Sequence, residues 1–170
     1  NSMSRGQPAL PEGLSAIVEF ADRISAVHHV AQGGITAELV TRDGDVFLKA
    51  ARRLEGREGP RLRSLWHEAL VYPYVVGIAP RFLWAMSAGE WVTLGLEHVH
   101  GRHADYAPGS PDLSVLAGLI ACLQQVPCPP TLTRFEERWA GWGGDVSLLA
   151  GDALLHTGLA PAHLLIAPGG

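Results

Sequence analysis

The chain has 170 residues, of which 47% are hydrophobic and 18% charged, enough for one ordinary domain or two small lobes with an apolar core. This composition excludes disordered, collagen-like and coiled-coil proteins. The formal net charge of -4 gives no overall basic field, so we expect neither nucleic acid nor a membrane as a partner. Because no apolar run is long enough to span a bilayer, we expect a cytoplasmic protein.

Lysine is unusually rare in this chain. Lys49 is the only lysine among 13 basic residues. Arginine and lysine differ in shape, hydration and reach, which raises the question of whether a compact ammonium is needed at this position. A codon bias towards arginine is the alternative explanation. The two cysteines, Cys122 and Cys128, are too few for a disulfide framework or a four-thiolate zinc site, and we expect both to be reduced.

The first half of the chain predicts a sheet with one helix. Residues 1–13 are expected to form an irregular leader, and strand signals begin from Leu14. Alternating apolar residues and turn signals predict strands at 24–30, 35–41, 46–50, 81–86 and 90–96. The Asp-Gly pair at 43–44 is typical of a tight hairpin turn. Pro60 suits the first turn of a helix at about 61–72. Together these segments predict a five-stranded antiparallel sheet.

The second half predicts mainly helices. Asp112 and Ser114 are candidate caps for a helix at about 113–125, whose continuous apolar character predicts burial. A short amphipathic helix is expected at 135–142. The fold class is therefore α+β, with four predicted parts: the leader 1–13, an amino-terminal lobe 14–98, a hinge and linker 99–111, and a helical carboxy-terminal lobe 112–170.

The order of elements in the first half has a chemical interpretation. A glycine turn at 32–34 lies between two strands, Lys49 lies on the third strand, and Glu68 lies in the helix that follows. A compact ammonium can reach phosphate oxygens while a helix carboxylate holds it in place. The alternative is that Lys49 is a solvated edge residue and Glu68 points outward.

Residues 154–166 carry the second motif, with His156, Leu159 and Pro161 followed by an apolar strand at 164–166. In this order of elements the chain resembles the aminoglycoside phosphotransferase and choline kinase-like family, which has the protein kinase-like fold and a catalytic loop of the form His-x-Asp-Leu-x-x-x-x-Asn. The resemblance covers nearly the whole chain. It also includes Ala79-Pro80 at the entry to the fourth strand and the helix at 113–126.

The resemblance implies an ATP-dependent phosphorylation of a small-molecule hydroxyl, such as that of an aminoglycoside or a choline-like alcohol, with ATP and Mg²⁺ as cofactors. It assigns Gly33 and Gly34 to the nucleotide loop and pairs Lys49 with Glu68 at the phosphates. It assigns Glu97, His98 and Val99 to the hinge that holds adenine. His156 would be a buried, neutral residue that holds the loop.

This sequence departs from the family at the positions of its catalytic and metal-binding residues. Gly158 stands where the family has its catalytic Asp, and His163 stands where it has a metal-binding Asn. Glycine cannot accept a proton, and histidine is a poor ligand for Mg²⁺, which puts Mg²⁺ binding in doubt. We therefore expect a degenerate loop at His156, Gly158 and His163, with no intact catalytic residue or metal-ligand set, and little or no transferase activity.

The family continues past the strand at 164–166 into a second metal-binding Asp and further helices, whereas this sequence stops at Gly170. We expect a missing carboxy-terminal segment or a partner chain to cover exposed apolar surface. Two alternatives stay open at this stage. One is a non-catalytic nucleotide-binding or protein-interaction module, a pseudokinase. The other is a fragment of a longer, active phosphotransferase.

Overall fold

The computed structural model describes residues 9–30 and 33–168. The chain divides into two compact units. The first contains the described residues up to Tyr72 together with Pro80–Val99, and the second contains Pro73–Ala79 and the described part of His100–Gly170. Within the described ranges, every helix is too short or too polar to cross a membrane.

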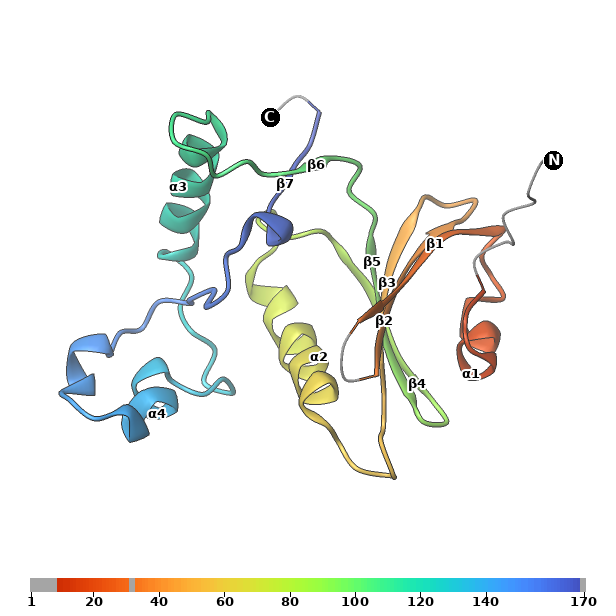
Figure 1. Ribbon diagram of the computed structural model, residues 1–170, viewed down its shortest axis with the longest axis horizontal. Helices are drawn as coiled ribbons and strands as arrows, with labels where there is room; N and C mark the ends of the chain where they lie inside the picture. Colours follow the sequence, from red (N-terminus) through yellow and green to blue (C-terminus); the bar gives the residue numbers. More distant parts are fainter. Residues whose placement is uncertain (1–8, 31–32, 169–170) are drawn as a thin grey trace. The chain divides into compact units, whose positions relative to one another are not determined.

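A five-stranded antiparallel sheet forms the centre of the first unit (Figure 1). Its strands are β1 (Arg23–Val30), β2 (Gly34–Val40), β3 (Val46–Arg52), β4 (Phe82–Ala88) and β5 (Trp91–Glu97). They lie side by side in the order β1-β2-β3-β5-β4. The sequence prediction of a five-stranded antiparallel sheet is confirmed, and β3 is its central strand. The glycine turn is described only from Gly33 onward, because Gln32 lies outside the described residues.

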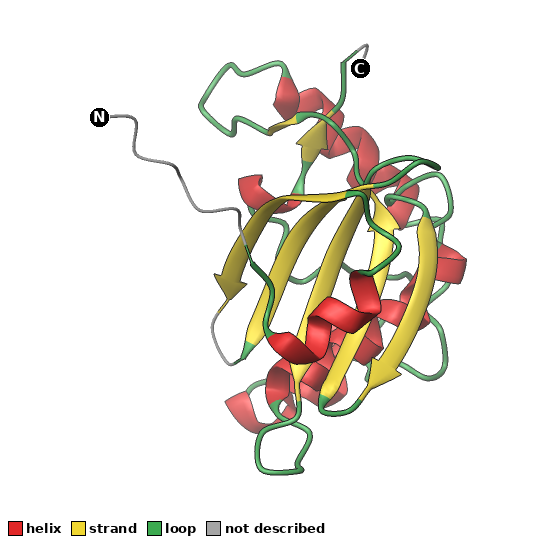
Figure 2. Ribbon diagram, turned by 90° about the vertical axis from the view of Figure 1, so that its right-hand side faces the viewer, coloured by secondary structure: helices red, strands yellow, loops and turns green. Residues whose placement is uncertain are grey.

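The two faces of this sheet carry separate apolar clusters, because side chains alternate between faces along a strand. Val46, Leu48 and Ala50 of β3 pack in a cluster with the segment that precedes β1. That segment forms the short helices α1 (Glu12–Ser15) and η1 (Ala16–Val18), which cross one face of the sheet (Figure 2). The expectation of strand signals from Leu14 is therefore wrong. Leu14 is fully buried under the sheet, in a helix.

Helix α2 (Pro60–Val71) covers the opposite face of the sheet. It begins with Pro60 after an extended Gly59, as predicted, since proline fixes the backbone angle that the first helical turn needs. The second cluster consists of Leu62 and Leu65 packed on Ala51, Val92 and Leu94. A 3₁₀ turn, η2 (Tyr72–Tyr74), ends the helix, and Tyr72 is buried.

The second unit combines helices with a small two-stranded sheet. Its elements are β6 (Arg102–His103), α3 (Asp112–Leu123), α4 (Phe135–Trp139), η3 (Ala140–Trp142), η4 (Val146–Leu149), η5 (Pro161–His163) and β7 (Leu165–Ile166). Strand β6 pairs with β7, so the segment predicted as a linker contains a strand. Two residues are too short a stretch to carry an alternating pattern.

The predicted burial of the helix after the linker is wrong. Val115 is 45% exposed and Ile120 is 41% exposed, and of the residues of α3 only Asp112 and Leu123 are buried. An apolar composition makes burial favourable, but burial also needs a facing surface, which a sequence pattern does not supply. The predicted cap is also different. The residue before α3 is Pro111, and Asp112 lies inside the first turn without capping it.

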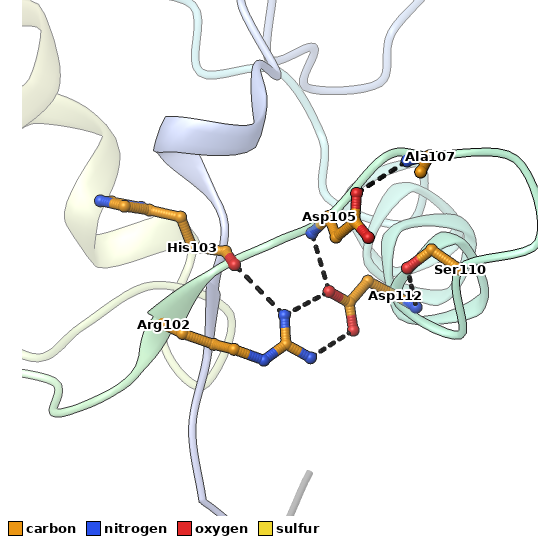
Figure 3. A network of polar contacts seen from close by, with 6 residues as sticks. All are labelled: Arg102, His103, Asp105, Ala107, Ser110 and Asp112. Carbon is orange, nitrogen blue, oxygen red and sulfur yellow. Dashed lines mark hydrogen bonds and ion pairs between the residues drawn. The ribbon is translucent and has the colours of Figure 1, made fainter.

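Asp112 instead joins a network of polar contacts within the second unit (Figure 3). Its two carboxylate oxygens accept hydrogen bonds from Arg102 Nη1 and Nη2 at 2.5 and 2.8 Å. The backbone N–H of Asp105 donates to the same carboxylate at 2.8 Å. Because Arg102 and the backbone of Asp105 satisfy both oxygens of this buried carboxylate, we assign the network a structural role.

Candidate functional site

Lys49 lies on the central strand of the sheet, on the face that α2 covers. It is opposite Thr36 on β2 and Leu94 on β5. Its neighbours Leu48 and Ala50 are buried on the other face, so the alternation of β3 directs Lys49 towards α2. Lys49 is therefore not an edge residue, and the alternative reading of a solvated edge lysine is wrong.

The ammonium of Lys49 and the carboxylate of Glu68 form an ion pair. The Nζ–Oε1 distance is 2.5 Å, and the two side chains are 28% and 31% exposed. Glu68 is three residues after the buried Leu65 on α2, so helical spacing turns it towards the sheet. The structure thus brings together the two residues that the sequence paired, with both side chains partly exposed to solvent.

A third side chain, Tyr72, completes this arrangement and was missed by the sequence analysis. Its hydroxyl donates a hydrogen bond to Glu68 Oε1 at 3.0 Å. Burial, together with the negative charge of Glu68 and this hydrogen bond, raises the pKa of the Tyr72 hydroxyl, so it stays protonated and remains a donor. The signal that could have found it is the four-residue spacing from Glu68, which places both side chains on one helix face.

The glycines assigned to the nucleotide loop lie at the start of β2. Gly33 has a φ of +74°, a left-handed conformation that favours glycine. Its carbonyl accepts a hydrogen bond from the backbone N–H of Arg52. At Gly34, a Cβ would lie 2.9 Å from Arg61 Nε, so glycine allows this arginine to pack against the strand.

The three residues assigned to the hinge follow or end β5. The backbone N–H of Glu97 donates to the carbonyl of Arg81 at 2.9 Å, and that of His98 donates to the carbonyl of Asp45 at 3.0 Å. The His98 ring also stacks on Phe47, with 6.2 Å between ring centroids. Since these two N–H groups already have acceptors, a purine would have to use Val99 and the hinge carbonyls.

The degenerate loop lies in the second unit, just before β7. The backbone N–H of Gly158 donates to His156 Nδ1 at 3.2 Å, and His163 Nδ1 donates to the Gly158 carbonyl. Both imidazoles therefore organise the loop through its backbone. The expectation that His156 is buried is wrong, since His156, Gly158 and His163 are all exposed.

The residues around Lys49 and those of the loop at 156–163 differ in the ligands they can bind. Lys49, Glu68 and Tyr72 form a half-buried group of no net charge, in which the Lys49 ammonium is the part that can meet an anion such as a phosphate. The loop at 156–163 offers imidazoles and backbone groups, whereas Mg²⁺ prefers carboxylate and other oxygen ligands. The loop residues therefore do not fit the magnesium ion that the resemblance implies.

The chain was also compared with known proteins. No protein-family model and no curated protein matches it.

Proposed function

We propose that this chain binds the phosphates of a nucleotide such as ATP at Lys49 and has little or no phosphotransferase activity. The observation that carries the proposal is the ion pair between Lys49 Nζ and Glu68 Oε1, formed by the central strand and the helix that covers it. The α+β arrangement, with a five-stranded antiparallel sheet and one helix packed on it, is compatible with a kinase-like amino-terminal lobe.

The pair suits a phosphate for a physical reason. An ammonium has three N–H donors, and Glu68 uses one of them. The remaining donors can reach oxygens of a phosphate, while the carboxylate keeps the flexible lysine side chain in one position and reduces the entropy lost on binding. Gly33 and Gly34 would let the first hairpin approach the phosphates, and Val99 and the hinge carbonyls would contact adenine.

The proposed lack of transfer activity depends on the loop in the second unit. A substrate hydroxyl needs an acceptor for its proton, and Gly158 has no side chain to provide one. His163 donates its Nδ1 proton to a backbone carbonyl and is not an oxygen ligand. We therefore expect nucleotide binding that does not depend on Mg²⁺. We propose no hydroxyl compound as a phosphate acceptor.

ATP binding measured by calorimetry and thermal shift, with and without Mg²⁺, tests the proposal. We expect ATP alone to stabilise the protein and Lys49→Ala to weaken binding at least about tenfold, or about 1.4 kcal/mol. Arg42→Ala is the matched control, because it removes one exposed positive charge from the same unit. Equal binding by wild type and Lys49→Ala would contradict the proposed site.

A turnover assay tests the second half of the proposal. ATP consumption with an alcohol or aminoglycoside acceptor at ordinary kinase rates of about 1–100 s⁻¹, abolished by Lys49→Ala, would show that the chain is an active enzyme. We expect no turnover above background.

A protein-interaction module is the second candidate, and a separate observation favours it. In the second unit, Val76, Trp142 and Leu148 are 83%, 80% and 84% exposed. Large apolar side chains with this exposure can contact a partner. The absence of any stabilisation by ATP, with or without Mg²⁺, would favour this candidate over nucleotide binding.

A further inference from the structure

A single carboxylate oxygen in the first unit receives two hydrogen bonds. Glu68 Oε1 accepts from Lys49 Nζ at 2.5 Å and from the Tyr72 hydroxyl at 3.0 Å. Glu68 lies in the last turn of α2, Tyr72 lies four residues later at the start of η2, and Lys49 lies on β3. The tyrosine therefore reaches the carboxylate from the turn that ends the helix, and the lysine reaches it from the sheet.

We propose that Tyr72 is a positioning residue of the nucleotide site, whose hydroxyl holds the Glu68 carboxylate where it can fix Lys49 for a phosphate. This inference rests on the proposed function. It assigns Tyr72 a role through Glu68 and Lys49, and no contact with the nucleotide.

The ring of Tyr72 is well placed to act as a fixed support. Only 9% of the residue is exposed. Its ring packs on Phe82 of β4, with 5.5 Å between centroids and 32° between planes. A buried ring held by an aromatic neighbour has few alternative rotamers, so its hydroxyl has a defined position relative to the sheet.

The alternative ways of holding Glu68 are weaker. Glu68 is about one third exposed, and a glutamate has several rotamers at such a site. An ion pair with a flexible lysine does not by itself select one of them, since both partners can move together. The hydroxyl stays protonated because burial and the charge of Glu68 raise its pKa. It can therefore act only as a donor to this carboxylate.

The test is a double-mutant cycle on ATP binding. Tyr72→Phe removes one oxygen and keeps the ring, and we expect ATP affinity to fall about 3- to 10-fold. If Tyr72 acts through the carboxylate, the same change should cost less than about twofold in a Glu68→Gln background. Tyr74→Phe is the matched control, because Tyr74 is 45% exposed and lies in the same 3₁₀ turn, and we expect no change in affinity.

The single lysine supplies a second readout. In protein labelled with ¹³C-lysine, Lys49 gives the only lysine side-chain signals. We expect the Lys49 Cε signal, in the absence of ATP, to shift in Tyr72→Phe in the same direction as in Glu68→Gln, and to stay unchanged in Tyr74→Phe. A change that only loosened the fold would lower the melting temperature without this site-specific shift.

A measurement on wild-type Tyr72 keeps the inference testable if Tyr72→Phe does not fold. The chain has three tyrosines, so the Cζ signal of Tyr72 can be assigned with Tyr74→Phe and Tyr106→Phe. We expect this signal to stay in place when ATP binds, because the bond to Glu68 persists. A move to its position in Glu68→Gln would overturn the inference.

The outcomes separate the two proposals. ATP binding that needs Lys49 but is unchanged in folded Tyr72→Phe overturns the role of Tyr72 and leaves the proposed function standing. Equal losses from Tyr72→Phe in the wild-type and Glu68→Gln backgrounds also overturn it. A wild-type protein that does not bind ATP overturns the proposed function and, with it, this inference.

Discussion

Two ion pairs on β3 show how much the surroundings of a charged residue matter. Lys49 and Glu68 are both about 30% exposed and come from different elements that pack on each other. In the second pair the distance from Arg52 Nη2 to Glu90 Oε2 is also 2.5 Å, but these side chains are 52% and 54% exposed. Exposed pairs contribute little because water screens them. Of the two pairs, the half-buried one is better able to hold its side chains in place.

The surroundings of Gly158 indicate whether the degenerate loop has room for a carboxylate side chain at this position. A Cβ built there has no described atom within 4 Å, apart from its immediate chain neighbours. We therefore expect Gly158→Asp to fold normally and to change the melting temperature by less than about 2 °C. Thermal unfolding followed by circular dichroism measures this, and a loss of more than about 5 °C would contradict it.

Gly95, unlike Gly158, has no free space for a side chain. A Cβ there would lie 2.2 Å from the ring of Trp84, which packs over β5. We expect Gly95→Ala to destabilise the protein by about 1–3 kcal/mol, the usual cost of overpacking. Urea unfolding followed by tryptophan fluorescence measures the free energy. A stability equal to the wild type would show that the ring of Trp84 moves away without cost.

At the scale of elements, the pairing of β6 with β7 is linked to α3 by the side chain of Arg102. Arg102 lies on β6, donates to Asp112 in the first turn of α3, and also donates to the carbonyl of His103 at 3.2 Å. Glycine at position 101 also permits the pairing of β6 with β7, because a Cβ there would lie 2.6 Å from the carbonyl oxygen of Ile166 on β7. The short strand pair is thus tied to α3 by the Arg102 side chain, and Gly101 allows a close backbone approach to β7.

The acid stability of the protein should depend on Asp112. Hydrogen bonds from Arg102 and from the backbone N–H of Asp105 lower the pKa of Asp112 from 3.8 to about 2. A carboxylate with a lowered folded-state pKa contributes stability that is present above its unfolded pKa and lost as the pH falls through the folded pKa. We therefore expect this contribution to disappear between about pH 4 and pH 2.

The check is the urea midpoint of wild type and Asp112→Asn at pH 7, 4 and 2. We expect Asp112→Asn to be less stable at pH 7, with most of the difference lost by pH 2. Asp43→Asn, in an exposed hairpin turn, is the control and should change little. A difference between wild type and Asp112→Asn that stays constant over this range would rule out the carboxylate as its cause.

At the scale of the whole molecule, the residues assigned to the nucleotide all belong to one unit. Gly33, Gly34, Lys49, Glu68 and 97–99 lie in the first unit, whereas the loop at 156–163 lies in the second. A nucleotide held by the first group alone should stabilise that unit through linkage, since a ligand that binds only the folded state lowers the population of open forms.

Hydrogen exchange with and without ATP tests this assignment. We expect slower exchange in β2, β3, the end of α2 and the hinge, and no change of comparable size at 156–163. Lys49→Ala should abolish the protection, and Arg42→Ala should preserve it. Protection limited to the second unit would contradict the assignment of the site.

The sequence by itself determined the five-stranded sheet and the helix between its third and fourth strands, and it predicted the pairing of Lys49 with Glu68 from the order of the elements and the family resemblance. The sheet and the helix depend on local patterns, namely alternation along strands and a proline that suits a helix start. The tertiary structure alone decided that Tyr72 shares the Glu68 oxygen, that β6 pairs with β7, that α3 stays largely exposed and that Leu14 is buried in a helix. These features depend on which surfaces meet, and a local pattern contains no information about a distant packing partner.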